Sequence, residues 1–486
     1  MRRPPGCTKR FVPGGRRVGA PAINRRTVGM MKDKKVLVFG MARSGIAAAE
    51  LLLQKGAKVW ACDGKAEADF NGALDNIKAA GAVLCLGEKH PENLVEGMDA
   101  MVVSPGIPVD HPAVVRAKAL GVDVMGEIEY AYREAKGLLL AITGTNGKTT
   151  TTTLLGEIFK NAGRRTFVVG NIGTPYSGAA GEMKPGDVTV CEISSFMMET
   201  SRDFHPAICA VLNISEDHLN RHGTMEKYIS LKERIFEKCT GDDVVVLNWD
   251  DPITKEMASR VRCKVAWFSS RNPVPFGAFV QAGNIVYGTP QDNKPVCAAD
   301  EVYIPGEHNL KNALAATAMA MAAGIPAPVI RHTLRTFKGV EHRIEFVREL
   351  DGVRFINDSK GTNVDSSIQA VRAMNRPTVL ILGGYDKHTD FTPLCQEIVK
   401  CPISRVVLIG DTAGQCEETL EKVGYHGWVH CGYDFKAAVE KAFELANPGG
   451  NVLLSPSCAS FDMFKDYEER GEIFKNLVNH LEGRRA

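Results

Sequence analysis

The stretch Leu138-Leu-Leu-Ala-Ile142-Thr-Gly-Thr-Asn-Gly-Lys148-Thr-Thr runs from an apolar segment directly into a glycine-containing loop. A helical pattern follows over residues 151–161. A strand, a glycine loop and a helix in this order form the context of a phosphate-binding loop. Glycines let backbone N–H groups approach phosphate oxygens, and the helix N-terminus adds positive charge. The stretch therefore predicts an α/β fold that binds a nucleotide phosphate.

The residue types within this loop suit that chemistry. Lys148 can neutralise the β- and γ-phosphates, and the hydroxyl of Thr149 can ligate Mg²⁺. The loop departs from the consensus G-x-x-x-x-G-K-[ST], because Ile142 stands where the first glycine is expected. A bare Gly-Lys-Thr is often an ordinary turn, so the flanking strand and helix carry the prediction. We expect the phosphate contacts to come from Gly144, Thr145, Asn146, Gly147, Lys148, Thr149 and Thr150.

Strand and helix patterns alternate from Lys35 onward, which predicts parallel sheets covered by helices. The strand candidates are residues 36–39, 58–62, 100–103, 138–142, 167–169, 188–191, 208–212, 244–247, 378–382, 406–409 and 452–454. A hairpin over 344–356, turning at Asp351-Gly352, opens the last group. We predict three α/β domains, Rossmann-like at both ends with a phosphate-loop ATPase between them, at residues 35–137, 138–339 and 340–486.

Composition excludes several classes of protein. Of the 486 residues, 44% are hydrophobic and 24% charged, which is typical of a globular chain. The formal net charge of +2 gives no overall field that would attract nucleic acid or a membrane surface. No apolar run reaches the roughly 18 residues of a transmembrane helix. The 13 cysteines form no C-x-x-C pair, which argues against a disulfide framework or a zinc ribbon and favours the cytoplasm.

The start of the chain has its own composition. Residues 1–30 contain eight Lys or Arg, no Asp or Glu, and several Gly and Pro. This predicts a disordered basic tail, which we place at residues 1–34. An over-extended start, with true initiation near Met30 or Met31, fits the same composition. An Arg-rich, acid-poor transit peptide is the alternative.

Polar side chains follow two further strand candidates. One strand ends in Glu192, and the other ends in Asn213-Ile-Ser-Glu-Asp-His218. If both strands are parallel neighbours of the phosphate-loop strand, Glu192 and His218 meet at one sheet edge. A carboxylate near phosphates suits Mg²⁺, whereas a lone histidine is more often a structural hydrogen-bonding group. Lys232 follows on a helix, and the residues alone favour a solvated surface charge there.

A second glycine loop opens the first domain. Gly40-Met-Ala42-Arg-Ser44-Gly45 follows a strand and begins a helix, while Asp63 ends the next strand. The pattern nearly matches a dinucleotide fingerprint, although Ala42 replaces the middle glycine. It predicts that the loop binds a pyrophosphate. Asp63 either contacts the nucleotide or serves as a turn or cap residue.

The combination of motifs resembles the Mur ligase family over about residues 35–480. The shared motifs, in order, are Gly-Thr-Asn-Gly-Lys148-Thr, Asn171-Ile-Gly, Glu192-Ile-Ser-Ser-Phe, Asn-Ile-Ser-Glu-Asp-His218, Tyr228-x-x-x-Lys232, Gly306-Glu-His-Asn309-Leu-Lys-Asn312 and Glu341-His-Arg343. The third domain is similar to that of the members that add D-glutamate. Its marks are Asn357-Asp-Ser-Lys360-Gly-Thr-Asn363, Gly383-Gly-Tyr-Asp-Lys387 and Leu454-Ser-Pro-Ser-Cys-Ala-Ser460-Phe-Asp462.

The resemblance implies a cytoplasmic enzyme of peptidoglycan synthesis. It would use ATP to join D-glutamate to UDP-N-acetylmuramoyl-L-alanine through an acyl phosphate, as a monomer with small-molecule partners and no nucleic acid or membrane. It also implies two Mg²⁺ ions, one of them organised by Lys232 after carbamylation by CO₂. Three other hypotheses remain: a sibling ligase such as folylpolyglutamate synthase, a nicotinamide dehydrogenase and a non-catalytic nucleotide-binding regulator.

The resemblance further implies a role for each matching residue. Lys148 and Thr149 would hold the ATP phosphates and Mg²⁺, with Glu192 and His218 completing the metal sites. Residues near the adenine, ribose and γ-phosphate would be Asn309, Asn312, Arg343, Asp358 and Lys360. D-Glutamate would be held by Lys387, Ser460 and Phe461 and closed in by Tyr467. The uridine nucleotide would meet Gly40, Ser44, Gly45, Asp63, Ser104, Pro105, Gly106 and Asn171.

Overall fold

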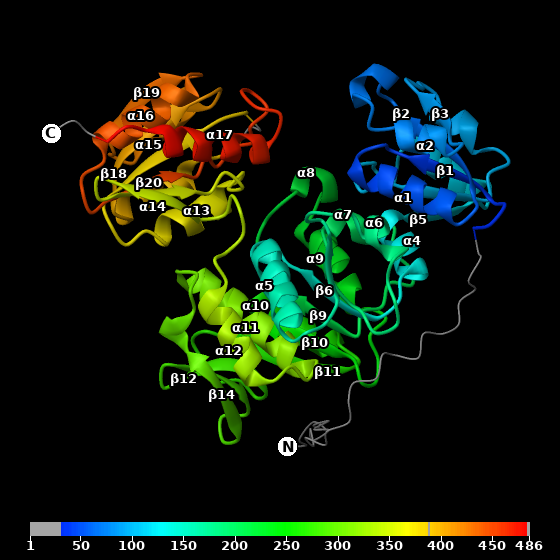
Figure 1. Ribbon diagram of the computed structural model, residues 1–486, viewed down its shortest axis with the longest axis horizontal. Helices are drawn as coiled ribbons and strands as arrows, with labels where there is room; N and C mark the ends of the chain where they lie inside the picture. Colours follow the sequence, from blue (N-terminus) through cyan, green and yellow to red (C-terminus); the bar gives the residue numbers. More distant parts are fainter. Residues whose placement is uncertain (1–30, 387–388, 484–486) are drawn as a thin grey trace, which may run out of the picture.

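The computed structural model describes residues 31–386 and 389–483 and arranges them as three α/β lobes in chain order (Figure 1). Each lobe holds one sheet, of five, nine and six strands. The predicted fold class, three domains with mainly parallel sheets covered by helices, is confirmed. Most of the predicted basic tail lies outside the described residues. Of its last residues, Met31 is buried in the core of the first lobe.

The N-terminal sheet is entirely parallel, in the order β3-β2-β1-β4-β5. Its central strand β1 leads into the first glycine loop, so that loop lies at the carboxyl edge of the sheet. The strands are β1 (Lys35–Phe39), β2 (Lys58–Asp63), β3 (Val83–Leu86), β4 (Ala100–Val103) and β5 (Asp123–Gly126). The helices are α1 (Arg43–Gln54), α2 (Asp75–Ala79), α3 (Pro112–Ala119) and α4 (Glu127–Glu134).

The central sheet has the order β14-β13-β12-β11-β10-β9-β6-β8-β7. It is parallel from β7 to β12, and β12, β13 and β14 pair antiparallel. The strands are β6 (Leu138–Thr143), β7 (Thr166–Gly170), β8 (Val188–Glu192), β9 (Ile208–Val211), β10 (Val244–Asn248), β11 (Lys264–Ser269), β12 (Gly277–Gln281), β13 (Asn284–Gly288) and β14 (Asn293–Ala298). The strands of this sheet from β6 to β10 were predicted from the sequence, whereas β11 to β14 were not, although β11, β12 and β13 each contain a short apolar run.

Two helix layers enclose the central sheet. One face packs on α5 (Lys148–Asn161), α11 (Glu307–Ala322) and α12 (Ala327–Thr336) through a single apolar core. The other face and the neighbouring segments hold α6 (Tyr176–Ala180), α7 (Ser195–Met198), α8 (Leu219–His222), α9 (Met225–Glu233) and α10 (Pro252–Met257). Among the described residues, no helix is long and apolar enough to cross a membrane.

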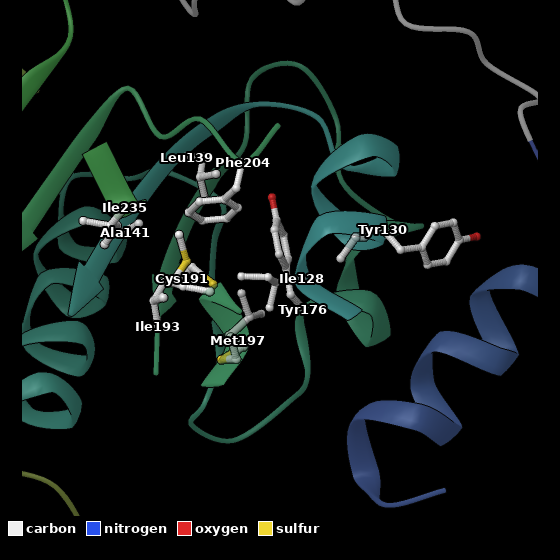
Figure 2. Close-up of a cluster of buried hydrophobic side chains, with 14 of the residues drawn as sticks. Ile128, Tyr130, Leu139, Ala141, Tyr176, Cys191, Ile193, Met197, Phe204 and Ile235 are labelled. Carbon is white, nitrogen blue, oxygen red and sulfur yellow. The ribbon is translucent and has the colours of Figure 1, made fainter. Parts of the chain in front are cut away.

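The first two lobes share one hydrophobic core. Ile128 of α4 and Tyr176 of α6 lie close to the strand residue Cys191, as Figure 2 shows. The aromatic ring of Tyr176 is 1% exposed, and Ile128 is also 1% exposed. Because apolar area is removed from water on both sides of this contact, the N-terminal lobe is fixed against the central one.

The C-terminal sheet has the order β15-β16-β20-β17-β18-β19. The predicted hairpin is confirmed, because β15 (Glu345–Leu350) and β16 (Val353–Asn357) pair antiparallel. Asp351 and Gly352 both have positive φ, 50° and 74°, as a tight hairpin turn requires. The other strands are β17 (Thr378–Gly383), β18 (Ile403–Ile409), β19 (Trp428–Gly432) and β20 (Asn451–Leu454). The helices are α13 (Val364–Arg372), α14 (Thr392–Lys400), α15 (Ala413–Lys422), α16 (Phe435–Leu445) and α17 (Tyr467–His480).

Candidate active site

The phosphate loop joins β6 to α5 and is shaped by its glycines. Gly147 has φ +84°, and a Cβ there would come 2.3 Å from Oδ1 of Asn312. A side chain at this position is therefore excluded by both backbone conformation and space. The helix begins at Lys148, directly after the loop. The free backbone N–H groups of this first turn face the position that a phosphate group takes in such loops.

Hydrogen bonds tie the phosphate loop to the segment that follows β9. The backbone N–H of Asn146 donates to Oδ1 of Asn213 at 2.8 Å, and Nδ2 of Asn213 donates back to the carbonyl of Asn146 at 2.9 Å. The hydroxyl of Thr145 donates to the carbonyl of Ser215 at 3.1 Å. These contacts fix the loop against the segment that ends in His218. Thr145 and Asn146 thus have a structural role here in addition to the predicted phosphate contact.

Lys148 turns back onto its own loop. Its Nζ donates to the carbonyls of Gly144 and Thr145 at 3.0 and 2.7 Å. Burial lowers the pKa of Lys148, and the carboxylates of Glu192 and Asp217 oppose that shift. An ammonium that is held only by carbonyl oxygens in a partly desolvated loop is stabilised further when an anion binds next to it.

Glu192 lies at the carboxyl end of β8, and His218 follows β9. Both strands are direct neighbours of β6, as the hypothesis of a shared sheet edge required. Glu192 is 1% exposed; its Oε1 accepts from Nδ2 of Asn171 at 3.0 Å, whereas its buried Oε2 has no hydrogen-bond partner. His218 has φ +54° and a half-exposed ring that packs on Phe196 at 4.8 Å. A buried carboxylate oxygen without a donor is suited to a cation.

Lys232 is not the solvated surface lysine that its residue type alone favours. It is 2% exposed, and its Nζ donates to the carbonyl of Gly144 at 2.8 Å. The same nitrogen lies 4.6 Å from the centre of the Tyr228 ring. Burial, and after it the nearby Lys148 ammonium, hold the pKa of Lys232 well below its ordinary value. This lysine therefore belongs to the interior of the phosphate-loop site.

Arg221 joins the central lobe to the N-terminal lobe, a role that sequence analysis missed. Its guanidinium donates to the backbone carbonyls of Gly106 at 3.1 Å and Ile107 at 3.0 Å. It also pairs with Glu199 at 2.6 Å and lies 4.8 Å from the ring centre of Phe196. Arg221 follows His218 by three residues, but no feature of the sequence indicates that it reaches another domain.

The first glycine loop is closely packed. A Cβ on Gly45 would lie 1.9 Å from the carbonyl oxygen of Gly40. The start of α1 can therefore pack this closely against the loop only if residue 45 is glycine. The hydroxyl of Ser104 donates to the same carbonyl at 2.7 Å. Asp63 accepts from the backbone N–H of Met41 at 2.7 Å. The carboxylate of Asp63 thus holds the loop, as the cap hypothesis expected, and a nucleotide contact by it is a prediction that stays open.

In the C-terminal lobe, Asp358 and Lys360 follow β16. Asp358 is 3% exposed and accepts from the hydroxyl of Ser455 at 2.7 Å and from the backbone N–H of Ile344 at 3.2 Å. Burial raises the pKa of Asp358 to about 6. Burial also lowers the pKa of Lys360, opposed by the carboxylate of Glu192. The hydroxyl of Ser215, in the segment tied to the phosphate loop, donates to Asp365 of the C-terminal lobe at 3.0 Å, so this lobe lies beside the loop.

A cavity of about 190 Å³ lies between the central and C-terminal lobes. Its lining includes Thr150 from the first turn of α5, Asn309 from α11 and Arg343 from the linker before β15. Asn312 does not line it but donates from Nδ2 to Oδ1 of Asn309 at 3.2 Å. Since the first turn of α5 directly follows the phosphate loop, the space suits the base and sugar of a nucleotide whose phosphates lie in that loop.

Three of the residues assigned to D-glutamate, Ser460, Phe461 and Tyr467, follow β20 in the chain. Ser460 is buried at 2% exposure, whereas Phe461 is 64% exposed and meets Tyr385 edge to face at 6.0 Å. The Tyr467 ring lies 5.3 Å from Nζ of Lys360. Lys387 lies outside the described residues. The structure thus brings Tyr467 toward Lys360 and leaves the ring of Phe461 exposed at the surface.

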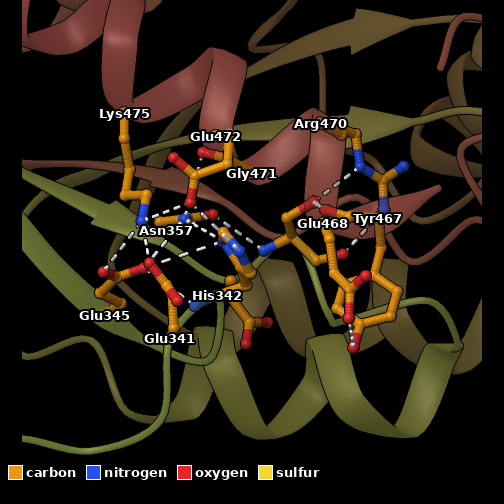
Figure 3. Close-up of polar contacts among 12 residues, drawn as sticks. Glu341, His342, Glu345, Asn357, Tyr467, Glu468, Arg470, Gly471, Glu472 and Lys475 are labelled. Carbon is orange, nitrogen blue, oxygen red and sulfur yellow. Dashed lines mark hydrogen bonds and ion pairs between the residues drawn. The ribbon is translucent and has the colours of Figure 1, made fainter. Parts of the chain in front are cut away.

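A charged network joins the linker before β15 to α17, as Figure 3 shows. Lys475 pairs with Glu341, and with Glu472 at 2.7 Å. His342 is 6% exposed, and its Nδ1 accepts from Nδ2 of Asn357 at 3.0 Å. Arg343 lines the cavity and lies between two anchored residues. His342 before it is bonded to Asn357, and the backbone N–H of Ile344 after it donates to Asp358.

Three family profiles match the chain, one in each lobe. The Mur ligase MurD-like, N-terminal domain matches residues 34–126. The Mur ligase middle domain matches residues 142–320, and the Mur ligase, glutamate ligase domain matches residues 342–458.

Curated relatives match almost the whole chain. The UDP-N-acetylmuramoylalanine--D-glutamate ligase of Caldanaerobacter subterraneus subsp. tengcongensis is 47% identical over 452 residues, covering 93% of this chain and 99% of the relative. The protein of the same name from Thermoanaerobacter pseudethanolicus is 47% identical over 455 residues, with the same coverage of both chains. That of Clostridioides difficile is 43% identical over 452 residues, again covering 93% and 99%.

Solved structures share the fold at lower identity. The UDP-N-acetylmuramate-alanine ligase MurC from Thermotoga maritima gives a TM-score of 0.58 at 19% identity, covering 92% of this chain and 99% of that one. MurF from Acinetobacter baumannii gives a TM-score of 0.59 at 18% identity, covering 87% and 91%. Both likenesses concern the three-domain arrangement alone.

Proposed function

The chain belongs to the Mur ligase family, and on that premise we propose that it uses ATP to join D-glutamate to UDP-N-acetylmuramoyl-L-alanine in peptidoglycan synthesis. The observation that carries this is the 47% identity, over 93% of the chain, to a UDP-N-acetylmuramoylalanine--D-glutamate ligase. A phosphate loop with a buried acidic neighbour is the apparatus that such a reaction needs.

The reaction begins when the L-alanyl carboxylate attacks the γ-phosphorus of ATP. An acyl phosphate forms, and ADP leaves. The D-glutamate amine then attacks the acyl carbon, and the tetrahedral intermediate collapses with loss of inorganic phosphate. Phosphorylation is needed because a carboxylate oxygen cannot leave as O²⁻. In such transfers the protein contributes chiefly positioning and electrostatic stabilisation.

Lys148 is proposed to stabilise the charge that develops on the transferring phosphoryl group. Its ammonium would exchange the carbonyls of Gly144 and Thr145 for the β- and γ-phosphate oxygens. Lys360 and Arg343 would approach from the C-terminal lobe, with the base and sugar of ATP in the cavity beside Asn309. Mutual repulsion among these cations falls once the phosphates lie between them.

The donors of the site fit Mg²⁺. The buried, unpartnered Oε2 of Glu192 is a hard oxygen ligand, the hydroxyl of Thr149 follows the loop, and His218 offers an imidazole. Magnesium, when bound, neutralises phosphate charge and orients the γ-phosphate for in-line transfer. His218 is half exposed and pairs with Asp217 at 3.6 Å, so it is also our candidate for accepting the proton of the D-glutamate ammonium.

Lys232 is proposed to carry a CO₂-derived carbamate that helps to hold a second Mg²⁺. The neutral amine attacks CO₂, an N–C bond forms, and one proton leaves to give an anionic carbamate. The lowered pKa of Lys232 supplies the neutral amine, and its burial next to Lys148 makes a second cation unfavourable there. The anionic oxygens of a carbamate can ligate Mg²⁺, whereas a charged amine would be repelled by the ion.

The carbamate is tested with two substitutions. Lys232→Ala is expected to be nearly inactive and partly rescued by a small carboxylate such as acetate, because it restores the missing oxygens. Lys232→Arg is expected to stay inactive with acetate, and rigorous removal of CO₂ should lower wild-type activity. Full activity of Lys232→Arg would remove the carbamate from the mechanism.

The remaining residues are proposed to hold the two carbon substrates. The glycine loop with Ser44 and the segment from Ser104 to Gly106 would face the pyrophosphate of the uridine nucleotide, with Asn171 nearer the reacting end. Lys387, Ser460, Phe461 and Tyr467 would enclose D-glutamate. We further propose that the enzyme works as a monomer in the cytoplasm, where ATP is supplied and its cysteines stay reduced.

A single assay tests the function. Phosphate release is measured with ATP and UDP-N-acetylmuramoyl-L-alanine, while D-glutamate, L-glutamate, L-lysine or diaminopimelate is supplied in turn. Release that requires D-glutamate supports the proposal. Preference for another amino acid points to a sibling ligase, ATP binding without turnover points to a regulator, and NADH binding points to a dehydrogenase.

A further inference from the structure

The central sheet carries a second group of chemically reactive side chains, at the edge opposite the phosphate loop. His205 precedes β9, Cys239 and Asp243 precede β10, and Cys263 directly precedes β11. These three strands are adjacent and parallel, with Ile208, Val244 and Lys264 in register. The parallel arrangement that gathers the phosphate-site residues at the carboxyl edge therefore gathers these at the amino edge.

The side chains of this group converge. Ligand atoms of His205, Cys239 and Asp243 all lie within 4.8 Å of one another. Nε2 of His205 lies 2.6 Å from Oδ2 of Asp243, and that oxygen also accepts from the backbone N–H of Thr240 at 2.8 Å. Cys263 lies beside this group, close enough that its thiol and that of Cys239 each shift the pKa of the other, and its Sγ lies 3.8 Å from the carbonyl oxygen of Lys264. Behind them, Sγ of Cys209 lies 4.0 Å from Sγ of Cys239.

We propose that four of these side chains form a tetrahedral site for Zn²⁺: His205, Cys239, Asp243 and Cys263. Two sulfurs, an imidazole and a carboxylate are the donor types that zinc takes, and thiols are not ligands for Mg²⁺. All four donors come from the central lobe, so the site closes without a water position and is structural. It joins the starts of three neighbouring strands.

Charge favours a cation at this place. Cys239 is 1% exposed, and the Asp243 side chain is 10% exposed. Within the described residues, no lysine or arginine pairs with Asp243; its charged partner is His205. Zinc binds the thiolate form of cysteine, so the thiols lose their protons on binding and the affinity should increase with pH.

The other His and carboxylate cluster, Glu341, His342 and Glu472, does not carry the same inference. The Lys475 ammonium lies among its carboxylates, 2.7 Å from Glu472, so a cation is already present (Figure 3). The proposed zinc site differs, because it has two thiols and, in the described part of the chain, no ammonium pairs with its carboxylate.

The test uses the full chain and a readout that is independent of ligation. The apoprotein, prepared with a chelator and then freed of it, is titrated with Co²⁺ and with Zn²⁺, and bound metal is measured by mass spectrometry. We expect one ion per chain and a thiolate-to-cobalt charge-transfer band. Competition by Mg²⁺ should be weak, and binding should weaken as the pH falls.

Substitutions identify the ligands. Cys239→Ser should abolish the band, while Cys263→Ser and His205→Ala, at partly exposed positions that tolerate change, should weaken binding by at least about tenfold. The matched controls are Cys297→Ser, another buried thiol of the central lobe, and Cys431→Ser, another partly buried thiol. Absence of the band in the wild type, equal losses in the controls, or a Cys239–Cys263 disulfide in the purified protein would overturn the site.

Discussion

Lys148 is the residue whose removal tests the phosphate loop most directly. Lys148→Ala should lower ligation about a hundredfold or more, because it removes a cation from the developing phosphoryl charge. The fold should persist, since the Nζ contacts are two loop carbonyls. Initial rates and thermal unfolding provide the measurement. Lys160→Ala, at the far end of the same helix, is the control, and near wild-type turnover of Lys148→Ala would refute the assignment.

Asp358 provides a test through pH. Because burial raises its pKa from 3.8 to about 6, the folded chain binds a proton that the unfolded chain has lost. Stability from this group is therefore lost as the pH rises through about 6 and regained below it. Between about pH 7.5 and pH 5, the free energy of unfolding should rise by about 1 kcal/mol more in the wild type than in Asp358→Asn. Denaturant titrations at the two pH values measure this, and equal changes would contradict the raised pKa.

Single residues also show where sequence reasoning reached its limit. The glycines and Lys148 could be assigned, because strand, loop and helix are contiguous in the chain. Lys232 could not be placed without resemblance to a family, since its burial depends on a contact with Gly144, 88 positions earlier. Asp63 could be placed near the first glycine loop from the pattern alone, but its bond with Met41, 22 positions earlier, could not be read from the sequence.

At the scale of elements, α8 links the central lobe to the 105–107 segment of the N-terminal lobe. Arg221 holds the 105–107 segment through its backbone carbonyls and is itself held by Glu199. Arg221→Ala should therefore raise KM for the uridine nucleotide about tenfold, with little change in KM for ATP. Steady-state kinetics with each substrate varied in turn measure the difference.

The control for Arg221 is Arg202→Ala. Arg202 also bridges the two lobes, to Asp123 at 2.5 Å, but away from the glycine loop, and such exposed pairs contribute little. In Arg202→Ala we expect KM for the uridine nucleotide to change by less than about twofold. An equal rise of KM in both variants would mean that general loosening of the lobes, and not the loop contact, is responsible.

Elements were predicted best where a compact apolar run or a turn motif marks them in the sequence. The buried parallel strands β1 and β6 are short continuous apolar runs, and the Asp351-Gly352 turn identifies its hairpin. The strand β14 contains Asn293, Lys294 and Pro295, so its sequence lacks a strand pattern. Its extended conformation is set by antiparallel pairing with β13. Tertiary context outweighs propensity there.

At the scale of the molecule, the setting of the C-terminal lobe depends on a link between the linker and α17. Lys475 of α17 binds Glu341 of the linker and Glu472 of its own helix (Figure 3). Arg343, two residues after Glu341, lines the cavity. No sequence pattern indicates this link, because it joins residues 134 positions apart. Orientation of whole domains is set by such sparse long-range contacts, which local periodicity cannot encode.

The last prediction tests that link. Lys475→Met keeps the length and apolar stem of the side chain but leaves the carboxylates of Glu341 and Glu472 uncompensated, so they repel and the linker loosens. We expect kcat/KM for ATP and for D-glutamate to fall about tenfold, while the affinity for the uridine nucleotide, bound by the other lobe, stays unchanged. Lys441→Met, which breaks the exposed pair with Glu444 on α16, should have no effect. Equal loss of nucleotide affinity in Lys475→Met would show that the variant disturbs the whole fold, and unchanged kinetics would show that the lobe is positioned by other contacts, such as the bond from Ser215 to Asp365 at 3.0 Å.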